Sequence, residues 1–243
     1  MTDETLMLTR MRALTPRLSG SDDALLETYW RFHPRFRFVK TAPANAMFLD
    51  LGAGGGGLAQ WAGWLDPHRA DIAFHGVDRE RGAGADLYAA WESADLDKQF
   101  PDFPGVTFDA VFMSHVIEHL ADPARMFGWI ATRLRPGGRL YLEWPGANAA
   151  LQPKREAFLR HGIDIMITNF FDDSTHLRML PMAELSAALT RTGFSIAEAG
   201  TIDLGVIGEE MLARGLASND GFARLAGYWS ISGWSEWIVA TRN

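Results

Sequence analysis

The sequence predicts an α/β fold built on a doubly wound sheet, and the first observation is the stretch 47–57. Met47 to Leu51 form an apolar run interrupted by Asp50, as in a buried parallel strand, and a glycine-rich turn follows. Glycine lets the backbone turn sharply and approach a ligand closely. A helix starting near Leu58 would point its N-terminal amides back into that turn, so the stretch predicts a nucleotide-binding corner.

The second observation is that strand-like and helix-like segments alternate after residue 47, which is typical of this fold class. Short apolar runs predict strands at residues 47–51, 72–78, 108–114, 139–145, 194–199 and 234–240, and residues 94–96 are interpreted as the end of a third strand or its loop. Helical segments are predicted between them, at residues 58–64, 83–92, 123–134, 181–192 and 208–228. We therefore expect a seven-stranded, mostly parallel sheet.

Two short helices are predicted before the first strand, at residues 5–18 and 21–32. Ser21 or Asp22 would cap the second helix, and Pro34 would end or bend it. The stretch from residue 31 to residue 40 alternates basic and aromatic side chains. We expect it to form a helix that packs its aromatic rings inward and leaves its arginines in solvent.

Length and composition predict one domain with small cap segments. A chain of 243 residues can bury a sizeable core, and 47% hydrophobic with 22% charged residues is ordinary for a globular protein. We expect a single domain with an N-terminal helical cap at 1–46, a cofactor-binding core at 47–145 and substrate-cap insertions at 146–180 and 204–229.

Charge and cysteine content exclude several classes of partner. The formal net charge of −7 argues against binding along a nucleic-acid backbone. No stretch approaches the ~18 consecutive apolar residues that predict a membrane span. The chain has no cysteine, which excludes disulfides and thiolate metal sites. We expect a cytoplasmic protein whose partner is a small molecule and not nucleic acid or a membrane; formation of a homodimer is left open.

The spacing of the residues in the glycine turn narrows the class of ligand. A dinucleotide fingerprint reads G-x-G-x-x-G, whereas this chain carries Asp50-x-Gly52-x-Gly54-x-Gly56. This pattern resembles the cofactor loop of the class I S-adenosylmethionine-dependent methyltransferases. The resemblance implies that the Asp50 carboxylate meets the amino group of the cofactor, directly or through water, while the bare backbone accommodates its methionine and ribose parts. The alternative is a flexible turn without a ligand.

Acidic residues after the next strands complete the expected cofactor site. Asp78 ends the second strand, where its two oxygens can accept hydrogen bonds from both ribose hydroxyls. Arg79 would flank the adenine, and the resemblance places an adenine-contacting acid at Asp95. The full predicted cofactor set is Asp50, Gly52, Ala53, Gly54, Gly56, Asp78, Arg79, Asp95, Leu96 and Ser114.

Three further motifs carry the resemblance across residues 48–145. They are a fourth strand opening with Phe108-Asp, then Glu118-His-Leu and Asp122-Pro, and a Leu134-Arg-Pro-Gly-Gly segment before the fifth strand. The resemblance implies a Rossmann-like seven-stranded sheet with an antiparallel last strand, and S-adenosylmethionine as cofactor with S-adenosylhomocysteine as product. It implies methyl transfer to an O or N atom of a small acceptor: a secondary metabolite, a quinone-like compound or a sugar.

His115, Glu118 and His119 follow the fourth strand and are the predicted catalytic residues. On one helical turn, all three side chains would lean to the same side. Ubiquinone-pathway O-methyltransferases are similar here, with Glu-x-x-Glu-His and a metal assigned to it, whereas His115 replaces the first Glu. We predict no metal and an acid/base or orienting role; a metal site and a purely structural role are the alternatives.

Four residues are predicted to bind the acceptor. Glu143 and Trp144 end the fifth strand, and Asp173 and His176 lie in an inserted segment, 163–178, that we expect to form a mobile cover.

Other functions compete with methyl transfer. His-x-x-Glu-His at 115–119 also matches an inverted zinc-protease motif, which needs two histidines four apart on a helix. An NAD-dependent oxidoreductase binds its nucleoside at the same sheet edge. A non-catalytic S-adenosylmethionine-binding module is the third alternative, because fold alone does not prove turnover.

Overall fold

The computed structural model describes residues 3–243, which form two compact units. The sheet unit contains residues 34–144, 180–200 and 237–243. The helical unit contains residues up to 33 together with 145–179 and 201–236. Each unit is described separately.

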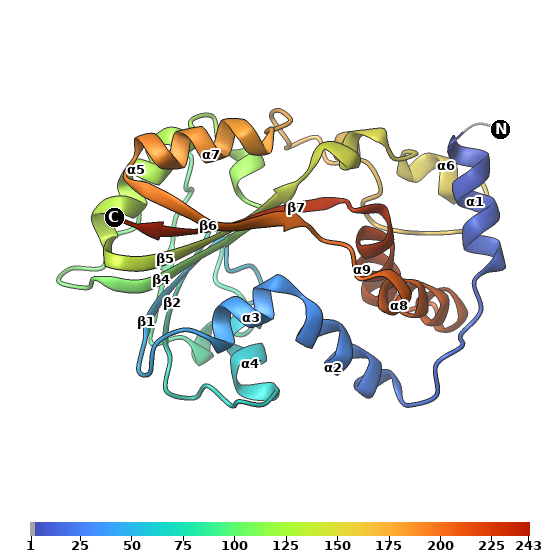
Figure 1. Cartoon of the computed structure of the whole chain (residues 1–243), viewed down its shortest axis with the longest axis horizontal. Helices are drawn as coiled ribbons and strands as arrows, with labels where there is room; N and C mark the ends of the chain where they lie inside the picture. The colour runs from blue at the N-terminus through green and yellow to red at the C-terminus, as the bar shows by residue number, and fades with distance from the viewer. Residues whose placement is uncertain (1–2) are drawn as a thin grey trace. The chain divides into compact units, whose positions relative to one another are not determined.

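The sheet unit is organised on a seven-stranded sheet (Figure 1), which is mostly parallel with antiparallel last strands, as predicted. Its strand order is β3-β2-β1-β4-β5-β7-β6. The strands are β1 (Met47–Leu51), β2 (Ala73–Asp78), β3 (Ala90–Ser93), β4 (Phe108–Ser114), β5 (Leu134–Pro145), β6 (Phe194–Thr201) and β7 (Ser235–Arg242). Strand β1 pairs in parallel with both β2 and β4, so the strand order reverses at β1. Ligands of doubly wound sheets bind beyond the carboxyl ends of the strands at such a reversal.

The helices of the sheet unit lie on both faces of the sheet (Figure 1). They are α3 (Pro34–Lys40), α4 (Gly57–Trp64), α5 (Pro123–Arg133) and α7 (Met182–Arg191), with single 3-10 turns η1 (Ala85–Leu87) and η2 (Ile117–His119).

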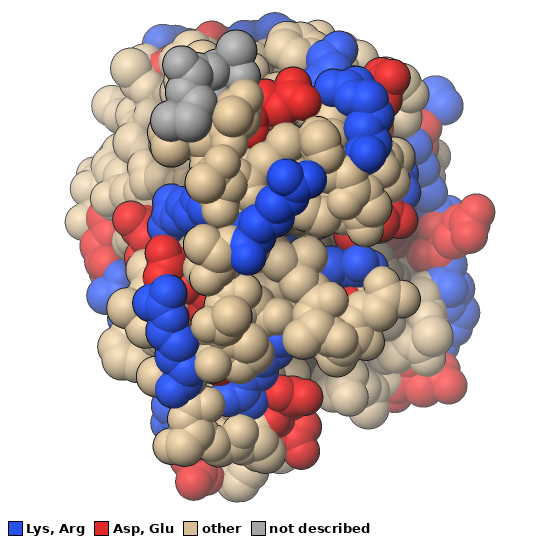
Figure 2. Space-filling model, turned by 90° about the vertical axis from the view of Figure 1, so that its right-hand side faces the viewer, with Lys and Arg blue, Asp and Glu red and all other residues tan. Residues whose placement is uncertain are grey.

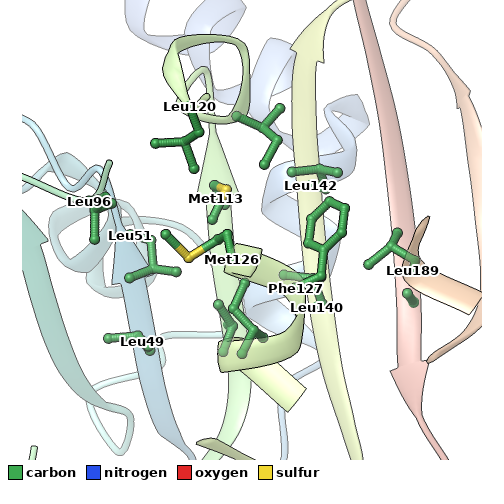
Figure 3. Close-up of a cluster of buried hydrophobic side chains, with 14 of the residues drawn as sticks. Leu49, Leu51, Leu96, Met113, Leu120, Met126, Phe127, Leu140, Leu142 and Leu189 are labelled. Carbon is green, nitrogen blue, oxygen red and sulfur yellow. The ribbon is translucent and has the colours of Figure 1, made fainter. Parts of the chain in front are cut away.

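One face of the sheet packs against α5 and α7 and forms the main hydrophobic core. Leu49, Met113 and Leu140 from three neighbouring strands lie with Phe127 of α5 and Leu189 of α7 (Figure 3). These side chains are fully buried. Because successive residues of a strand point to opposite faces, Asp50 and Glu143 face the other side.

The opposite face is aromatic and packs against α3. The Phe38 ring of α3 contacts the rings of Phe48, Phe112 and Tyr141, at centroid distances of 5.8, 6.4 and 5.4 Å. The Phe112 and Tyr141 rings are stacked, with centroids 5.0 Å apart. Asp50 and Glu143 therefore leave the sheet on the side where α3 lies.

The region of the third strand differs from the prediction. The predicted helix at 83–92 is reduced to the turn Ala85–Leu87, and the third strand is Ala90–Ser93, so residues 94–96 belong to the loop after it. The strand pairs in parallel with β2, where Trp91 lies opposite Gly76. A Cβ atom at Gly76 would lie 2.5 Å from the Trp91 ring and 2.9 Å from the Tyr88 ring. The absence of a side chain at Gly76 makes room for both rings, and this tertiary packing overrides the helical spacing.

The fifth strand begins earlier than predicted. Helix α5 ends at Arg133, and Leu134 already pairs with Phe108 of β4. The next pair is Ala110 with Arg139, so residues 135–138 form an irregularity within the strand pair. Gly137 and Gly138 lie in this irregular segment of the strand and not at the end of the helix.

The helical unit is built on an α-helical hairpin. Its helices are α1 (Asp3–Ala13), α2 (Asp22–Phe32), α6 (Arg155–Leu159), α8 (Gly205–Ser218) and α9 (Gly221–Ser232), with 3-10 turns η3 (Ala147–Leu151) and η4 (Phe170–Asp172). The single helical segment predicted at 208–228 is two helices, because Asn219 adopts a left-handed φ of 60° and Asp220 caps the second helix. The helices approach closely at Gly227, where a Cβ would lie 2.4 Å from the Leu212 nitrogen.

Surface charges of the helical unit are interspersed. Figure 2 shows acidic and basic side chains alternating over this face with no single-sign stripe. Two of the ion pairs within the unit join Arg10 to Glu209 and Arg160 to Glu4, at 2.7 and 3.1 Å. Among residues 3–243, no helix combines the length and the apolar character needed to cross a membrane.

The packing at Gly76 gives a stability prediction. We expect Gly76→Ala to lower the free energy of unfolding by about 1–3 kcal/mol, because the new methyl group overpacks against two buried rings. The control is Gly128→Ala in the middle of α5, where a Cβ meets nothing within 4 Å. That change should stabilise the protein by up to about 1 kcal/mol, since alanine is the better helix former. Urea denaturation measures both; equal stability of the two variants would contradict the packing.

Candidate cofactor and active site

The glycine turn after β1 has the conformation expected of a ligand-binding loop. Gly52, Gly54 and Gly56 have φ angles of 76°, 53° and 81°, a left-handed region that favours glycine. The turn is held against β2, because the backbone N–H groups of Gly52 and Ala53 both donate to the Val77 carbonyl, at 2.8 and 2.9 Å. A Cβ at Gly54 would meet no atom within 4 Å. The loop therefore borders open space with bare backbone, which fits a cofactor laid across it.

Asp78 is tied directly to this loop. One of its carboxylate oxygens accepts from the Gly54 N–H and the other from the Arg79 N–H, each at 2.7 Å. A carboxylate offers about four lone-pair sites, so two hydrogen bonds leave acceptor capacity. The side chain is half-buried and can accept further hydrogen bonds from ribose hydroxyls. The structure thus brings Asp78 and the glycine turn together.

Asp50 is buried on the α3 side of β1, with 2% of its surface exposed. Its Oδ2 accepts a hydrogen bond of 2.6 Å from the Tyr88 hydroxyl. Burial raises the pKa of Asp50 to about 7, the Tyr88 hydrogen bond opposes that rise, and the charge of Asp78 adds to it. Asp50 therefore gains and loses its proton near neutral pH.

The remaining predicted cofactor residues lie at the ends of β2, β3 and β4. Asp95 accepts from the Lys98 ammonium at 2.8 Å, and this hydrogen bond lowers the pKa of the Asp95 carboxyl. Leu96 is buried in the main core, and Arg79 is exposed. The Ser114 hydroxyl oxygen is buried and has no hydrogen-bond partner among the described residues. Cofactor contact stays a prediction for all four.

A cluster of charged side chains lies at the carboxyl ends of β4 and β5. His115 follows β4 with a left-handed φ of 55°, and its backbone N–H donates to the Glu143 carbonyl at 2.9 Å. Its ring nitrogens face two buried carboxylates: Nε2 lies 3.0 Å from Glu143 Oε1, and Nδ1 lies 3.4 Å from Glu118 Oε1. Burial alone would lower the pKa of His115, but hydrogen bonds and charges from both glutamates raise it. His115 is thereby favoured as an imidazolium.

Glu143 is the centre of this cluster and is fully buried. The Arg35 guanidinium of α3 binds both of its oxygens, with Nε 2.7 Å from Oε2. The Tyr141 hydroxyl donates to Oε2 at 2.6 Å. The expectation that arginines of this helix lie in solvent is wrong for Arg35, because the buried Glu143 carboxylate requires a cation.

Lys40 is a second basic residue of α3 with partners inside the protein. It is buried, and its ammonium donates to the carbonyls of Ala62, Leu65 and Pro67 around the end of α4. A cation at a helix C-terminus satisfies carbonyl groups that have no partner within the helix.

The spacing of the two histidines is not helical. His115 has a left-handed φ, and residues 117–119 form one 3-10 turn ending at His119. The expectation that 115, 118 and 119 share one helical turn is therefore wrong. The zinc-protease motif also loses its basis, since it needs both histidines on one α-helix. The His119 side chain is 23% exposed, and its Nε2 lies 4.0 Å from Glu118 Oε1.

The four predicted acceptor-binding residues fall into both units. Glu143 and Trp144 are fully buried in the sheet unit, and the Trp144 indole donates to the Leu180 carbonyl at 2.9 Å. Asp173 and His176 lie in the helical unit, where the His176 Nδ1 lies 2.6 Å from the Phe170 carbonyl oxygen. Acceptor contact stays a prediction for all four.

The segment 163–178 has a dense hydrogen-bond network inside the helical unit. Asp172 accepts from the backbone N–H groups of Arg155, Thr168 and Asn169, at 2.8 to 3.2 Å. The Trp229 indole donates to the Ile167 carbonyl at 2.9 Å. That this segment is a mobile cover stays a prediction. Its motion would have to break these hydrogen bonds or move their partners with it.

Comparison with known proteins shows the family of the chain. A family model described as a methyltransferase domain matches residues 25–199, which is more than half of the chain. The chain belongs to this methyltransferase family. The match confirms the resemblance to methyltransferases seen in the cofactor loop. Membership of this family disfavours the oxidoreductase and protease alternatives.

Individual relatives are more distant. The methyltransferase is 31% identical over 100 residues to a ubiquinone biosynthesis O-methyltransferase of Parvibaculum lavamentivorans, a match covering 39% of this chain and 38% of that protein. The chain thus spans about two fifths of the length of that curated relative.

Two solved structures share the fold. One is an S-adenosylmethionine-dependent methyltransferase from Mesorhizobium loti, with a TM-score of 0.55 and 19% sequence identity. The match covers 88% of this chain and 100% of that protein's chain. Another is a coclaurine N-methyltransferase bound to N-methylheliamine and S-adenosylhomocysteine, with a TM-score of 0.58 and 14% sequence identity. The match covers 96% of this chain and 78% of that protein's chain.

Sequence reasoning missed Arg35, Tyr88 and Tyr141, whose side chains hold the acidic residues of the site. Tyr88 could have been suspected from Gly76, because a strand glycine often marks a close approach. No local signal pointed to Arg35, whose partner Glu143 is 108 residues away.

The hydrogen bonds of Asp78 give a binding prediction. We expect Asp78→Ala to weaken S-adenosylhomocysteine binding by about 1–3 kcal/mol, because hydroxyl donors would lose a buried acceptor. The control is Asp86→Ala in the same loop, where the carboxylate pairs with Arg81 at the surface and its loss should leave affinity unchanged. Calorimetry measures both. If both Asp78→Ala and Gly54→Val bound S-adenosylhomocysteine with unchanged affinity, the cofactor site would not lie at this corner.

Proposed function

We propose that this methyltransferase methylates an O or N atom of a small acceptor: a secondary metabolite, a quinone-like compound or a sugar. The name of the ubiquinone biosynthesis relative supports an aromatic hydroxyl of a quinone-like compound as the first acceptor to test. The methyltransferase bound to N-methylheliamine supports keeping amines in the panel. We also propose a cytoplasmic location, on the basis of the cysteine-free, acidic composition.

The observation that carries the proposal is the position of titratable side chains beside the cofactor corner. Asp50 of β1 pairs in register with Phe112 of β4, and Ser114 pairs with Glu143 of β5. Adjacent strands lie about 4.8 Å apart, and residues along a strand rise by about 3.3 Å. His115 and its two glutamates therefore follow directly beyond the strand next to the cofactor acid, where a reacting acceptor would approach.

S-adenosylmethionine supplies an electrophilic methyl group for in-line displacement from its sulfonium. What remains for the protein is to align the acceptor, exclude water and take the proton that a hydroxyl or amine loses. Residues 47–145 carry the cofactor site in this proposal, with 1–46, 146–180 and 204–229 as cap segments that bind the acceptor.

The histidines have different roles in this proposal. His115 lies between Glu118 and Glu143 with a raised pKa, so it serves as a fixed cation that orders both glutamates and not as a base. His119 is more accessible, and the Glu118 carboxylate beside its Nε2 can orient its ring. We therefore assign the acid/base role to His119.

This assignment predicts a split between turnover and binding. We expect His119→Ala to lower kcat by about 100-fold or more, the usual contribution of a positioned acid/base group, with S-adenosylhomocysteine affinity unchanged. His68→Ala is the control, because that side chain is 64% exposed and should leave turnover as it is. Release of S-adenosylhomocysteine with a panel of catechols, phenols and amines measures kcat. Full turnover in His119→Ala would remove its catalytic role, and no turnover of any acceptor by the wild type would favour a non-catalytic binding module.

A metal is not part of the proposal. Both ring nitrogens of His115 face carboxylates, so ligation there would require the ring to leave these partners. We expect the wild type to keep its full activity after dialysis against a chelator. Loss of activity that one divalent ion restores would instead support a metal held by His115, Glu118 and His119.

A further inference from the structure

The Tyr88 hydroxyl joins three parts of the cofactor corner. It donates to Oδ2 of Asp50 on β1 at 2.6 Å. Burial raises the pKa of this hydroxyl, and the nearby backbone N–H of Ala59, in the first turn of α4, opposes that rise. Tyr88 itself lies between η1 and β3 and is 8% exposed. One buried hydroxyl therefore connects the cofactor acid to the helix that follows the glycine turn.

The corner needs such a group because the glycine turn has no side chains. The N-cap of α4 is Gly56, which makes no side-chain capping bond, so amides of the first turn require another acceptor. The Tyr88 hydroxyl lies near one of these amides, that of Ala59. Space for the Tyr88 ring comes from Gly76, where a Cβ would lie 2.9 Å from it. The ring is held by Phe74 and Trp91, at centroid distances of 5.8 and 5.2 Å.

The surroundings of Asp50 contain little else that could stabilise a negative charge. Its register partners are Gly76 on β2 and Phe112 on β4, and neither has a polar side chain. The Asp78 carboxylate opposes ionisation of Asp50 through its charge, and Arg35 of α3 favours it through its charge. Tyr88 supplies the side-chain hydrogen bond, and a tyrosine hydroxyl is a neutral donor.

We propose that Tyr88 is a positioning residue of the cofactor site, which aims Asp50 at the amino group of the cofactor and makes cofactor binding release one proton. This inference rests on the proposed function, because it takes the ligand to be S-adenosylmethionine or its product. When the cofactor binds, the O–H bond of the Asp50 carboxyl group breaks and the proton passes to the solvent. The electron pair stays on the carboxylate, which takes the cofactor ammonium as its new partner, and nothing is oxidised or reduced.

The direction of the pH effect follows from burial. The pKa of Asp50 is raised to about 7 by burial, so below that pH the group is mostly protonated before the cofactor arrives. An ammonium favours the ionised carboxyl group, so binding must displace the proton, and affinity falls by up to about tenfold for each pH unit below 7. The Tyr88 hydrogen bond favours the carboxylate. Removing the hydroxyl should therefore move the midpoint of the affinity profile to higher pH.

Calorimetric titration of the whole chain with S-adenosylhomocysteine from pH 5.5 to 8.5 tests this inference. Titrations in phosphate and in Tris, whose ionisation heats differ, give the number of protons released. For the wild type we expect close to one proton at the acidic end and close to none at the alkaline end. For Tyr88→Phe we expect the midpoint to rise by about one pH unit, the effect of losing one hydrogen bond to a charged group. The control is Tyr228→Phe, a buried tyrosine of the helical unit bonded to Gln152, which should leave the midpoint unchanged.

A second variant keeps the inference testable if Tyr88→Phe fails to fold. Asp50→Asn preserves the shape of the side chain but cannot titrate, so proton release should disappear and weak binding should become independent of pH. Proton release that persists in Asp50→Asn, or identical pH profiles for the wild type and Tyr88→Phe, would overturn the role of the pair. Failure of the wild type to bind S-adenosylhomocysteine at any pH would overturn the proposed function, and this inference with it.

Discussion

Two buried carboxylates on one face of the sheet are the constraint on which the site depends. Strand alternation directs Leu49 and Leu142 into the apolar core, so Asp50 and Glu143 must face α3. A buried carboxylate is costly unless donors surround it. The sheet unit meets this requirement by bringing Tyr88 to Asp50 and by bringing Arg35 to Glu143.

The two carboxylates obtain different partners and therefore different chemistry. Asp50 has a neutral hydroxyl as its hydrogen-bond donor, and burial raises its pKa to about 7, so its charge responds to an arriving cation. Glu143 is bound by the guanidinium of Arg35 and by His115, so its charge is neutralised within the protein. Environments that separate the charge states of neighbouring acids also separate their roles. In the proposed function, Asp50 serves the cofactor and Glu143 holds the segment from His115 to His119 in place.

Local signals predicted much of the fold, and distant contacts account for what was missed. The limits of β4 were predicted correctly, and the glycine turn with Asp78 could be anticipated, because strand alternation and glycine spacing are local properties. The helix predicted at 83–92 was wrong because the conformation there depends on two aromatic rings packing over Gly76. Arg35 was expected in solvent because its buried partner lies on β5, far along the chain. His115 was placed on a helix because sequence spacing does not reveal a left-handed residue.

A crystal structure of the full chain grown with S-adenosylhomocysteine tests the central claim most directly, that the corner formed by β1, the glycine turn and β2 is the cofactor site. We expect both ribose hydroxyls within hydrogen-bond distance of Asp78, the product amino group beside Asp50 and its amino-acid part over the glycines at 52–56. A product molecule bound elsewhere, with Asp78 making only the hydrogen bonds to Gly54 and Arg79 seen here, would contradict it.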